Sequence, residues 1–368
     1  MRFIAFERIT PGMVLGRAVR DYKNRLLLNE GVVLTPELIT RLEGLGYPGF
    51  YVHDELSKDI EINEAISQEL RNRATAAVRD LNVDVIRDVA KNIVEQILNS
   101  PTVSLDMADL RTFDDYTFAH SVNVAVVSTV MGMGCHMSHQ DLIYLCQAAL
   151  FHDIGKLSID PEILNRPGPL SREEMTLVRR HPQNSYDMLS ENWEIPSSVR
   201  LGVLMHHENE DGSGYPNGLK GDKIHPFAKI IHIADVYDAL SSKRPYKKAY
   251  SCAETLEYIM SCCYYMFDEE YVRTFLRCVP IYPKGTMVYL SDGREALVVE
   301  NTALYATRPK LRLEDGTDLD MLNDASLRNV TIVAENGNEL LDTGEIEQME
   351  TERKVKEIIE DVLLSPEE

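Results

Sequence analysis

The chain has 368 residues, 44% of them hydrophobic and 26% charged, which is typical of soluble globular proteins and long enough for two or three domains. Its formal net charge of −21 argues against DNA or polymeric RNA as a partner, because neutralising phosphates requires clustered Lys and Arg. A small anionic substrate still fits this charge if bound cations reverse the potential locally.

No segment has the roughly 20 consecutive apolar residues that a membrane span needs. The N-terminal sequence MRFIAFERITPGMV contains an acid and a proline where a signal peptide would be uninterrupted and apolar. We therefore expect a cytoplasmic protein without a membrane span. The six cysteines show no CxxC spacing, which favours buried free thiols over disulfides or a zinc site.

Residues 1–58 alternate short β-like runs with turn signals and predict a small α+β module. Within it, Leu38 and Leu42 fall at helical spacing, and Gly44 indicates where that helix ends. Residues 59–100 then predict a helical linker, made of one long helix or a helix pair. Apolar residues recur in it at intervals of three and four: Val78, Leu81, Val85, Val89 and Ile93.

That apolar stripe requires a partner surface. The next domain and a second copy of the chain in a homodimer are both open alternatives.

Residues 101–279 read as successive helices joined by turns rich in Pro and Gly, and predict an all-α domain. Residues 280–340 alternate at period two around the turn signals Asp292-Gly293 and Asp315-Gly316, and predict a small β module. Residues 341–368 predict an acidic tail or helix, so the fold class is mainly α.

The segment LCQAALFHDIGKL places Asp153 beside His152 in an apolar helical run. A buried, ionised carboxylate costs several kcal/mol unless a cation holds it, and the run has no Lys or Arg before Lys156. A metal ion would satisfy the carboxylate, with His152 as a second ligand. A second aspartate in an apolar run is found in KIIHIADVYDAL, where Asp235 is surrounded by apolar residues.

Four further histidines fall in apolar or capping contexts between or before these acids. A single histidine on an apolar helix is more often a hydrogen-bonded core residue than a ligand. The prediction of a metal site therefore depends on these histidines occurring together with the two aspartates. His and Asp without Cys favour Fe, Mn or Zn. Seven candidate ligands are too many for one ion: His120, His152, Asp153, His181, His206, His207 and Asp235.

With Asp153 as the bridge, His120, His152 and Asp235 would complete the shell of one ion. The other ion would take His181, His206 and His207, leaving room for a bridging water. His232 lies three residues before Asp235 and is left as a core or supporting histidine.

These residues lie in motifs that together resemble the HD-GYP branch of the HD phosphohydrolase superfamily, over about residues 110–260. The motifs are His120, HDIGK at 152–156, His181, HHENEDGSGYP at 206–216 and IADVYDALSSKRPY at 233–246. The resemblance implies hydrolysis of cyclic di-GMP to pGpG at a di- or trinuclear iron or manganese centre, and leaves open a further step to GMP.

Carried over residue by residue, the resemblance assigns all seven candidates as metal ligands, with Asp153 also in the catalytic set. Lys156 matches the lysine beside the scissile phosphate. The substrate-binding residues implied are Gly214, Tyr215, Asp238, Arg244 and Lys247. Some members with a third metal have a glutamate four residues before the first ligand histidine, where this chain has Tyr116. Two ions are therefore expected, and a third is in doubt.

Local chemistry supports these roles independently. Lys156 lies one turn past His152 and could offset charge on a leaving oxygen, although a lysine at a helix C-terminus is an equal alternative. Arg244 suits bidentate phosphate contact, against the alternative of an ordinary solvated basic patch that also holds Lys247.

The leading hypothesis is a phosphodiesterase in which a bridging hydroxide at a dinuclear site attacks phosphorus and Lys156 assists departure. Three alternatives remain. The substrate could be another cyclic dinucleotide, or the protein could be a non-catalytic nucleotide, oxygen or redox sensor that uses the same centre. It could also act as an interaction hub whose N-terminal module binds a signalling protein.

Overall fold

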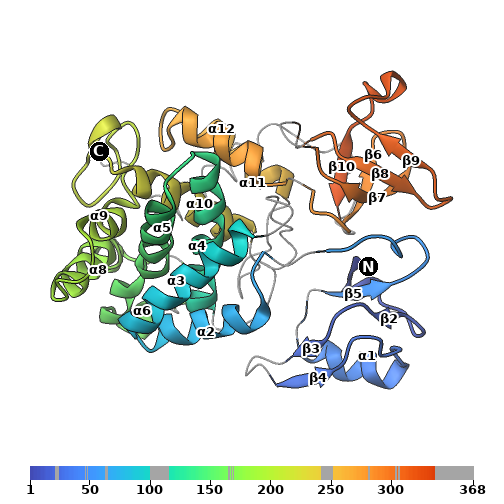
Figure 1. Cartoon of the computed structure of the whole chain (residues 1–368), viewed down its shortest axis with the longest axis horizontal. Helices are drawn as coiled ribbons and strands as arrows, with labels where there is room; N and C mark the ends of the chain where they lie inside the picture. The colour runs from blue at the N-terminus through green and yellow to red at the C-terminus, as the bar shows by residue number, and fades with distance from the viewer. Residues whose placement is uncertain are drawn as a thin grey trace.

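The computed structural model describes residues 1–20, 25–45, 47, 49–62, 65–99, 116–164, 166, 168, 170–241, 252–280, 282–302, 305 and 307–335. Over these residues the chain forms a helical core with two small β-containing modules lying side by side at one flank (Figure 1). The mainly α class predicted from the sequence is confirmed, with an α+β module at the N-terminus and a β-sheet near the C-terminus.

The N-terminal module contains a three-stranded antiparallel sheet, a two-stranded hairpin and one α-helix. Helix α1 begins after the N-cap Thr35, whose side chain accepts a hydrogen bond from Leu38 N, and it ends at Gly44 as predicted. The elements are β1 (Arg2–Ala5), η1 (Phe6–Arg8), β2 (Val14–Leu15), β3 (Val19–Arg20), β4 (Leu26–Leu28), α1 (Pro36–Glu43) and β5 (Gly49–His53), with sheet order β1-β5-β2.

The predicted helical linker is a pair of helices, α2 (Gln68–Arg79) and α3 (Val83–Leu98), capped by Ser67 and Asn82. Their apolar stripe is covered by the helices that follow, because α2 packs on α3 and on α4 (Tyr116–Gly134), and α3 packs on α5 (His139–Phe151). Val78, Val89 and Ile93 are buried in the same hydrophobic core as those helices. The stripe therefore finds its partner surface within the chain.

The remaining helices of the core are arranged around α4 and α5, with α10 packed on α4 and α9 packed on α5. Helices α4, α5 and α10 are apolar around most of their circumference, as expected of helices buried on all sides. The elements are α4 (Tyr116–Gly134), α5 (His139–Phe151), η3 (Ile154–Ser158), α6 (Pro161–Leu164), α7 (Arg172–Val178), α8 (His181–Ser190), α9 (Ser197–Met205), η4 (Gly221–Lys223), α10 (Pro226–Ser241), α11 (Cys252–Ser261) and α12 (Glu269–Cys278).

The C-terminal module is a five-stranded antiparallel sheet with strand order β10-β6-β7-β8-β9. The Asp-Gly pairs expected at turns do close the hairpins, since Gly293 and Gly316 have φ of 86° and 85°, a region that favours glycine. The elements are β6 (Met287–Leu290), β7 (Glu295–Glu300), β8 (Lys310–Leu313), β9 (Asp318–Asp320), η5 (Ala325–Leu327) and β10 (Ile332–Glu335).

The two modules contact each other although they lie at opposite ends of the described chain (Figure 1). Phe3 N donates a hydrogen bond of 2.9 Å to Gly285 O, and Met1 and Tyr51 pack on a small apolar cluster that contains Leu297. Sequence reasoning treated the modules as separate, and their association is visible only in the tertiary structure. The boundaries predicted at 58, 100, 279 and 340 remain predictions, and residues 100 and 340 lie outside the described part.

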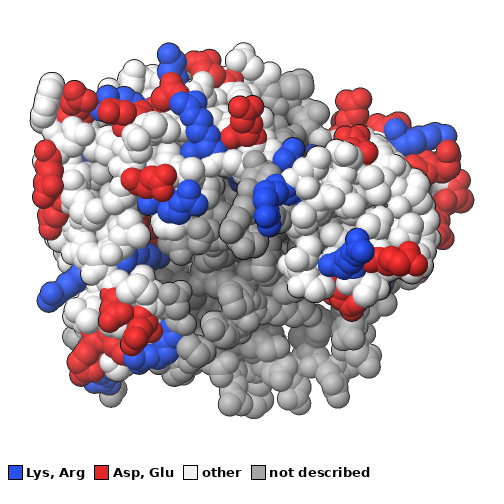
Figure 2. Space-filling view, turned by 90° about the horizontal axis from the view of Figure 1, so that it is seen from below, with Lys and Arg blue, Asp and Glu red and all other residues white. Residues whose placement is uncertain are grey.

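The five cysteines whose side chains the structure describes are free thiols, of which Cys146 is buried and the others half-buried. The described helices include no segment with the length and apolar character of a bilayer span. On the face drawn in Figure 2, basic and acidic side chains are interspersed, and the described residues form no continuous basic tract there.

Candidate metal centre

The seven residues predicted as metal ligands converge on one buried region in the middle of the helical core. Each comes from an element end or helix face that points inward: His120 on α4, His152 and Asp153 between α5 and η3, His181 at the start of α8, His206 and His207 after α9, and Asp235 on α10. Five helices that are separate in sequence thus supply one site.

Asp153 lies at the centre of this group. Its Oδ1 is 3.3 Å from Nε2 of His181, and its Oδ2 is 3.4 Å from Nε2 of His152 and 3.9 Å from Nε2 of His120. On the far side, Nε2 of His120 is 2.9 Å from Oδ1 of Asp235. Asp153 therefore contacts histidines of both ligand sets expected from the sequence.

Hydrogen bonds at Nδ1 determine which ring nitrogen faces the centre. Three imidazoles bond through Nδ1 to a backbone carbonyl three residues earlier, and each pair is short: His152 with Ala149 O at 2.7 Å, His181 with Val178 O at 2.8 Å and His206 with Val203 O at 2.6 Å. A carbonyl only accepts, so Nδ1 carries the proton in a neutral ring and Nε2 keeps its lone pair. This is the tautomer that binds a metal through Nε2.

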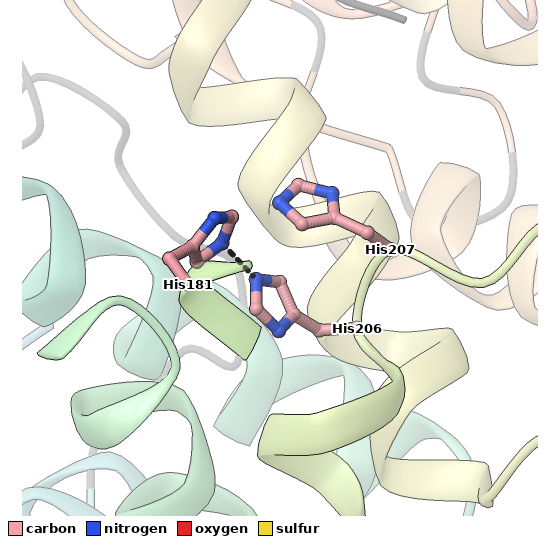
Figure 3. A group of neighbouring side chains, drawn as sticks. All are labelled: His181, His206 and His207. Atoms are coloured by element: carbon pink, nitrogen blue, oxygen red, sulfur yellow. Dashed lines mark hydrogen bonds between the residues drawn. The ribbon is translucent and has the colours of Figure 1, made fainter. Parts of the chain in front are cut away.

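The three histidines His181, His206 and His207 turn their rings toward one another (Figure 3). Nε2 of His181 lies 3.2 Å from Nε2 of His206. If both Nδ1 atoms hold their protons, these two nitrogens face each other as lone pairs and repel. Two nitrogens bound to one ion at about 2.0–2.1 Å lie roughly 3–3.5 Å apart, so a shared cation accounts for the spacing.

Two buried polar atoms of the group lack hydrogen-bond partners among the described residues. They are Nε2 of His152 and Oδ1 of Asp153, both on residues that are less than 5% exposed. Such atoms are costly to bury without a partner. Together with the donor set they fit a divalent cation, and the described residues form three groups with ligand atoms within 4.8 Å of one another: His181, His206 and His207; His120, His152 and Asp153; and His152, His206 and Asp235. The buried clusters thus suit a multi-metal site.

The electrostatic environment of the group favours an ionised carboxylate at Asp153 and a neutral imidazole at His181. Burial alone would raise the pKa of Asp153, but Lys156 and the imidazoles of His152 and His181 hold it well below its usual range. Burial lowers the pKa of His181 to about 4, so that ring is neutral at physiological pH. Neutral imidazoles beside ionised carboxylates are the protonation states that metal binding requires.

His120 differs from the other histidines because two carboxylates flank it. Burial alone would lower its pKa, but hydrogen bonds to Asp235 and Asp238 raise the pKa of His120 to about 9. With a proton on Nε2, the ring donates to Asp235. A divalent cation would replace that proton between the same two residues.

Lys156 lies where the sequence predicted, one turn beyond His152 on η3. Its Nζ is 2.6 Å from Oδ2 of Asp153, and the side chain is 29% exposed, so the ammonium group borders both the buried site and solvent. Gly155 makes this arrangement sterically feasible, because an added Cβ would lie 2.2 Å from His181 O. Only glycine allows η3 to approach the start of α8 this closely.

The loop after the histidine doublet forms one wall of the site. Tyr215 stacks on His207 with ring centroids 4.7 Å apart, and its backbone N donates to His207 O at 3.0 Å. At Gly214 an added Cβ would lie 2.4 Å from His207 O, so the loop folds back tightly on the doublet. Both oxygens of Glu208 accept backbone bonds, from Asn217 N at 2.7 Å and Leu219 N at 2.8 Å.

Asp238 occupies a different place from the substrate-facing one expected. It is fully buried, one turn beyond Asp235 on α10, and its Oδ2 lies 2.7 Å from Nδ1 of His120. Its Oδ1 accepts from Nδ2 of Asn123 at 2.9 Å. A carboxylate in this position orients a ligand histidine and increases its basicity. Its geometry therefore indicates support of His120 rather than contact with substrate.

Arg244 and Lys247 lie outside the described residues, as does the side chain of Tyr116, so the expectations for them stay untested. Sequence reasoning assigned no role to Asn123, Gly155 or Glu208. The signals were present for two of them, because Gly155 stands inside HDIGK and Glu208 directly follows the histidine doublet. Asn123 carries no comparable signal, being a single polar residue on an apolar helix.

His232 is buried, and its Nδ1 lies 3.1 Å from Glu208 O. The bond connects α10 to the start of the loop that carries Tyr215. His232 therefore lies behind the residues predicted as ligands, and its place outside the ligand set stays a prediction.

The chain is similar to known proteins over its helical core. The family model described as HD domain matches residues 93–270. Cyclic di-GMP phosphodiesterase PA4108 of Pseudomonas aeruginosa is 35% identical over 265 residues, which cover 68% of this chain and 64% of that protein. The response regulator RpfG of Xanthomonas campestris, a cyclic di-GMP phosphodiesterase, is 36% identical over 167 residues, 45% of this chain and 44% of that protein.

A third relative, 3'3'-cGAMP-specific phosphodiesterase 3 of Vibrio cholerae, is 32% identical over 224 residues, 54% of this chain and 48% of that protein. The chain thus spans less than two thirds of each of these relatives. Its helical core and buried His and Asp cluster make it an HD domain protein. Within that class it is related to the HD-GYP cyclic di-GMP phosphodiesterases.

Proposed function

We propose that the chain is a metal-dependent phosphodiesterase that hydrolyses cyclic di-GMP to pGpG. The observation that carries the proposal is the convergence of seven His and Asp side chains in one buried region, where hydrogen bonds at Nδ1 leave a lone pair on Nε2 of three neutral rings. Two relatives named as cyclic di-GMP phosphodiesterases support the choice of substrate.

Two ions, iron or manganese, are the proposed cofactors. Asp153 would be shared between them, because it contacts His120 and His152 on one side and His181 on the other. Bound ions of this kind lower the pKa of a water molecule and neutralise phosphate oxygens. The ligand-bearing elements place these side chains against the apolar core, and Lys156 and Asp235 remain partly exposed at the edge of the site.

The chain's own residues supply binding and proton handling. Lys156 presents an ammonium group at the edge of the site, where it stabilises the charge that develops on the departing 3′ oxygen. Tyr215 presents a half-buried ring beside His207, suited to line the substrate site, with Gly214 holding the loop in place. Arg244 and Lys247 are proposed to contact the nucleotide, and the guanidinium group of Arg244 suits its phosphates.

The test is product analysis with protein purified anaerobically and loaded with Fe²⁺ or Mn²⁺. We expect pGpG to accumulate from cyclic di-GMP, and we expect Asp153→Asn to lose both bound metal and turnover. The matched control is Asp222→Asn, at an exposed aspartate in η4, which should change neither. Full turnover by Asp153→Asn would reject the proposed centre.

The choice of substrate among cyclic dinucleotides requires a separate experiment, because one relative is named as 3'3'-cGAMP-specific. Competition between cyclic di-GMP and 3'3'-cGAMP in one reaction measures the ratio of kcat/KM directly. Tight nucleotide binding by metal-loaded protein without any product would favour the sensor alternative. In that case the same residues would form a binding site that signals without hydrolysis.

A further inference from the structure

A buried chain of hydrogen bonds connects helix α2 to the metal centre. It begins at Arg71, whose Nη1 donates to Oδ1 of Asn123 at 2.7 Å. Asn123 donates from Nδ2 to Asp238 at 2.9 Å, and Asp238 contacts Nδ1 of His120 at 2.7 Å. All four side chains are less than 8% exposed. The path crosses α2, α4 and α10, and it ends on a proposed metal ligand.

The helix geometry places this chain of bonds directly behind the ligands. Asn123 follows His120 by three residues on α4, and Asp238 follows Asp235 by three residues on α10, so each polar residue sits one turn from a ligand. Asp238 uses one oxygen for His120 and the other for Asn123. The orientation of its carboxylate therefore depends on both partners.

Arg71 determines which way the Asn123 amide faces. An amide has one acceptor oxygen and one donor nitrogen, and a guanidinium group only donates. With Arg71 bound to Oδ1, Nδ2 must point toward Asp238. Without the arginine, the amide could rotate and turn its oxygen toward the carboxylate, which would repel it.

Burying an arginine is costly unless it is hydrogen-bonded, and this one lies 52 residues from Asn123 in sequence. Arg73 on the same helix shows the alternative, since it is half-exposed and pairs with Asp88 at the surface. Helix α2 thus places one arginine, Arg71, in the interior of the domain next to the site.

We propose that Arg71 is a positioning residue of the metal centre, acting through Asn123 and Asp238 to hold His120 in its ligating orientation. The proposal rests on the metal-binding role proposed above. It makes α2, the first described helix after the N-terminal module, a structural part of the site. The coupling is made by side chains alone and does not require Arg71 to touch substrate or metal.

The experiment measures binding of Mn²⁺ to the full chain, using the electron paramagnetic resonance signal of free Mn²⁺, with folding checked by circular dichroism. We expect Arg71→Gln to weaken Mn²⁺ binding about 10-fold, the scale known for residues that support metal ligands. Arg71→Lys keeps a donor for Asn123 and should stay within about threefold of the wild type. Arg73→Gln is the control and should bind as the wild type does.

A double-mutant cycle shows whether the effect passes through Asn123. Asn123→Leu should weaken Mn²⁺ binding by itself about 10-fold, and adding Arg71→Gln to it should change the affinity less than about twofold. Independent, additive losses would overturn the proposal, as would a folded Arg71→Gln protein that binds Mn²⁺ normally. If Arg71→Gln fails to fold, normal Mn²⁺ binding by Asn123→Leu would overturn it instead.

The readout separates this inference from the proposed function, because no turnover is measured. Wild-type protein that binds Mn²⁺ but hydrolyses no cyclic dinucleotide would defeat the phosphodiesterase proposal. The dependence of Mn²⁺ affinity on Arg71 would still support the positioning role in that case.

Discussion

Nζ of Lys156 lies 2.6 Å from Oδ2 of Asp153, on the carboxylate that also contacts three of the proposed ligand histidines. The two residues are three apart on the short turn of η3, so the ammonium group is held at the rim of the buried cluster. An amino group in this place can serve a reaction without being a ligand.

The first prediction distinguishes a role of Lys156 in the reaction from a role in assembling the metal centre. Lys156→Met should lower kcat about 100-fold, the usual cost of losing one preorganised charge at a reacting oxygen. Metal content should be retained, since the ammonium group competes with cations for Asp153. Elemental analysis and steady-state kinetics on the same sample check this, with the exposed Lys223→Met as control. Loss of metal in proportion to activity would show that Lys156 acts on the centre's assembly.

The second prediction concerns the close approach of η3 and α8. Gly155→Ala places a Cβ 2.2 Å from His181 O and 2.6 Å from Ser185 N, so α8 must move and carry His181 with it. We expect a loss of about 2–3 kcal/mol in the free energy of unfolding, at the upper end for overpacking, together with weaker metal binding.

Denaturant unfolding and metal titration of that variant supply the measurement. Gly44→Ala is the matched control, because no atom lies within 4 Å of the added Cβ and the backbone there is right-handed helical. Unchanged stability in Gly155→Ala would mean that the segment relaxes without cost.

The third prediction concerns the wall built by the loop after His207. Glu208 is 2% exposed and accepts from Asn217 N and Leu219 N, so Glu208→Gln removes one charged acceptor and leaves one backbone N–H unsatisfied. We expect a loss of about 2 kcal/mol in stability. KM for the cyclic dinucleotide should rise about 10-fold, because the loop positions Tyr215.

In Glu208→Gln the metal content should be unchanged, since no oxygen of Glu208 belongs to a ligand cluster. The exposed Glu191→Gln provides the comparison. A drop in kcat at constant KM would place Glu208 in the chemical step and remove it from loop positioning.

The fourth prediction is a pH dependence of stability. Burial lowers the pKa of His232 to about 4, against 6.5 for an unburied histidine. Between these values the unfolded chain binds a proton that the folded chain does not, so stability falls as pH decreases from 6.5 toward 4. At pH 5 this one residue should cost about 2 kcal/mol.

His232→Asn keeps a donor for Glu208 O but cannot titrate in this range. The difference in unfolding free energy between pH 7 and pH 5 should therefore shrink by about 2 kcal/mol in the variant. Chemical denaturation at both pH values measures it. An equal pH dependence in variant and wild type would show that the folded protein accepts a proton on His232 without strain.

Several parts of the fold and of the site could be predicted because their signals are local. Asp153 and Asp235 are ionisable residues inside apolar helical runs, and such a residue must have a cation or a hydrogen-bonding partner wherever the helices go. The turns at Gly293 and Gly316 were predictable for a similar reason, because a positive φ favours glycine at that one position whatever the rest of the fold. The apolar stripe of residues 60–100 predicted burial but left its partner open.

Other parts depend on which helices meet. Asp238 was expected to face substrate, and it supports His120 instead, because the rotation of α10 against α4 decides which of its turns faces the centre. Asn123 has no local signal of function, and its role arises from partners 52 and 115 residues away.

The sequence by itself determined the helical class and the residue types of the centre, because the periodicity of apolar residues and the cost of a buried charge are local properties of the chain. Only the tertiary structure decided which nitrogen of each ring faces inward and which buried side chains hold the ligands. It also showed that the two terminal modules pack together. Those features come from contacts between segments far apart in the chain, which no local pattern records.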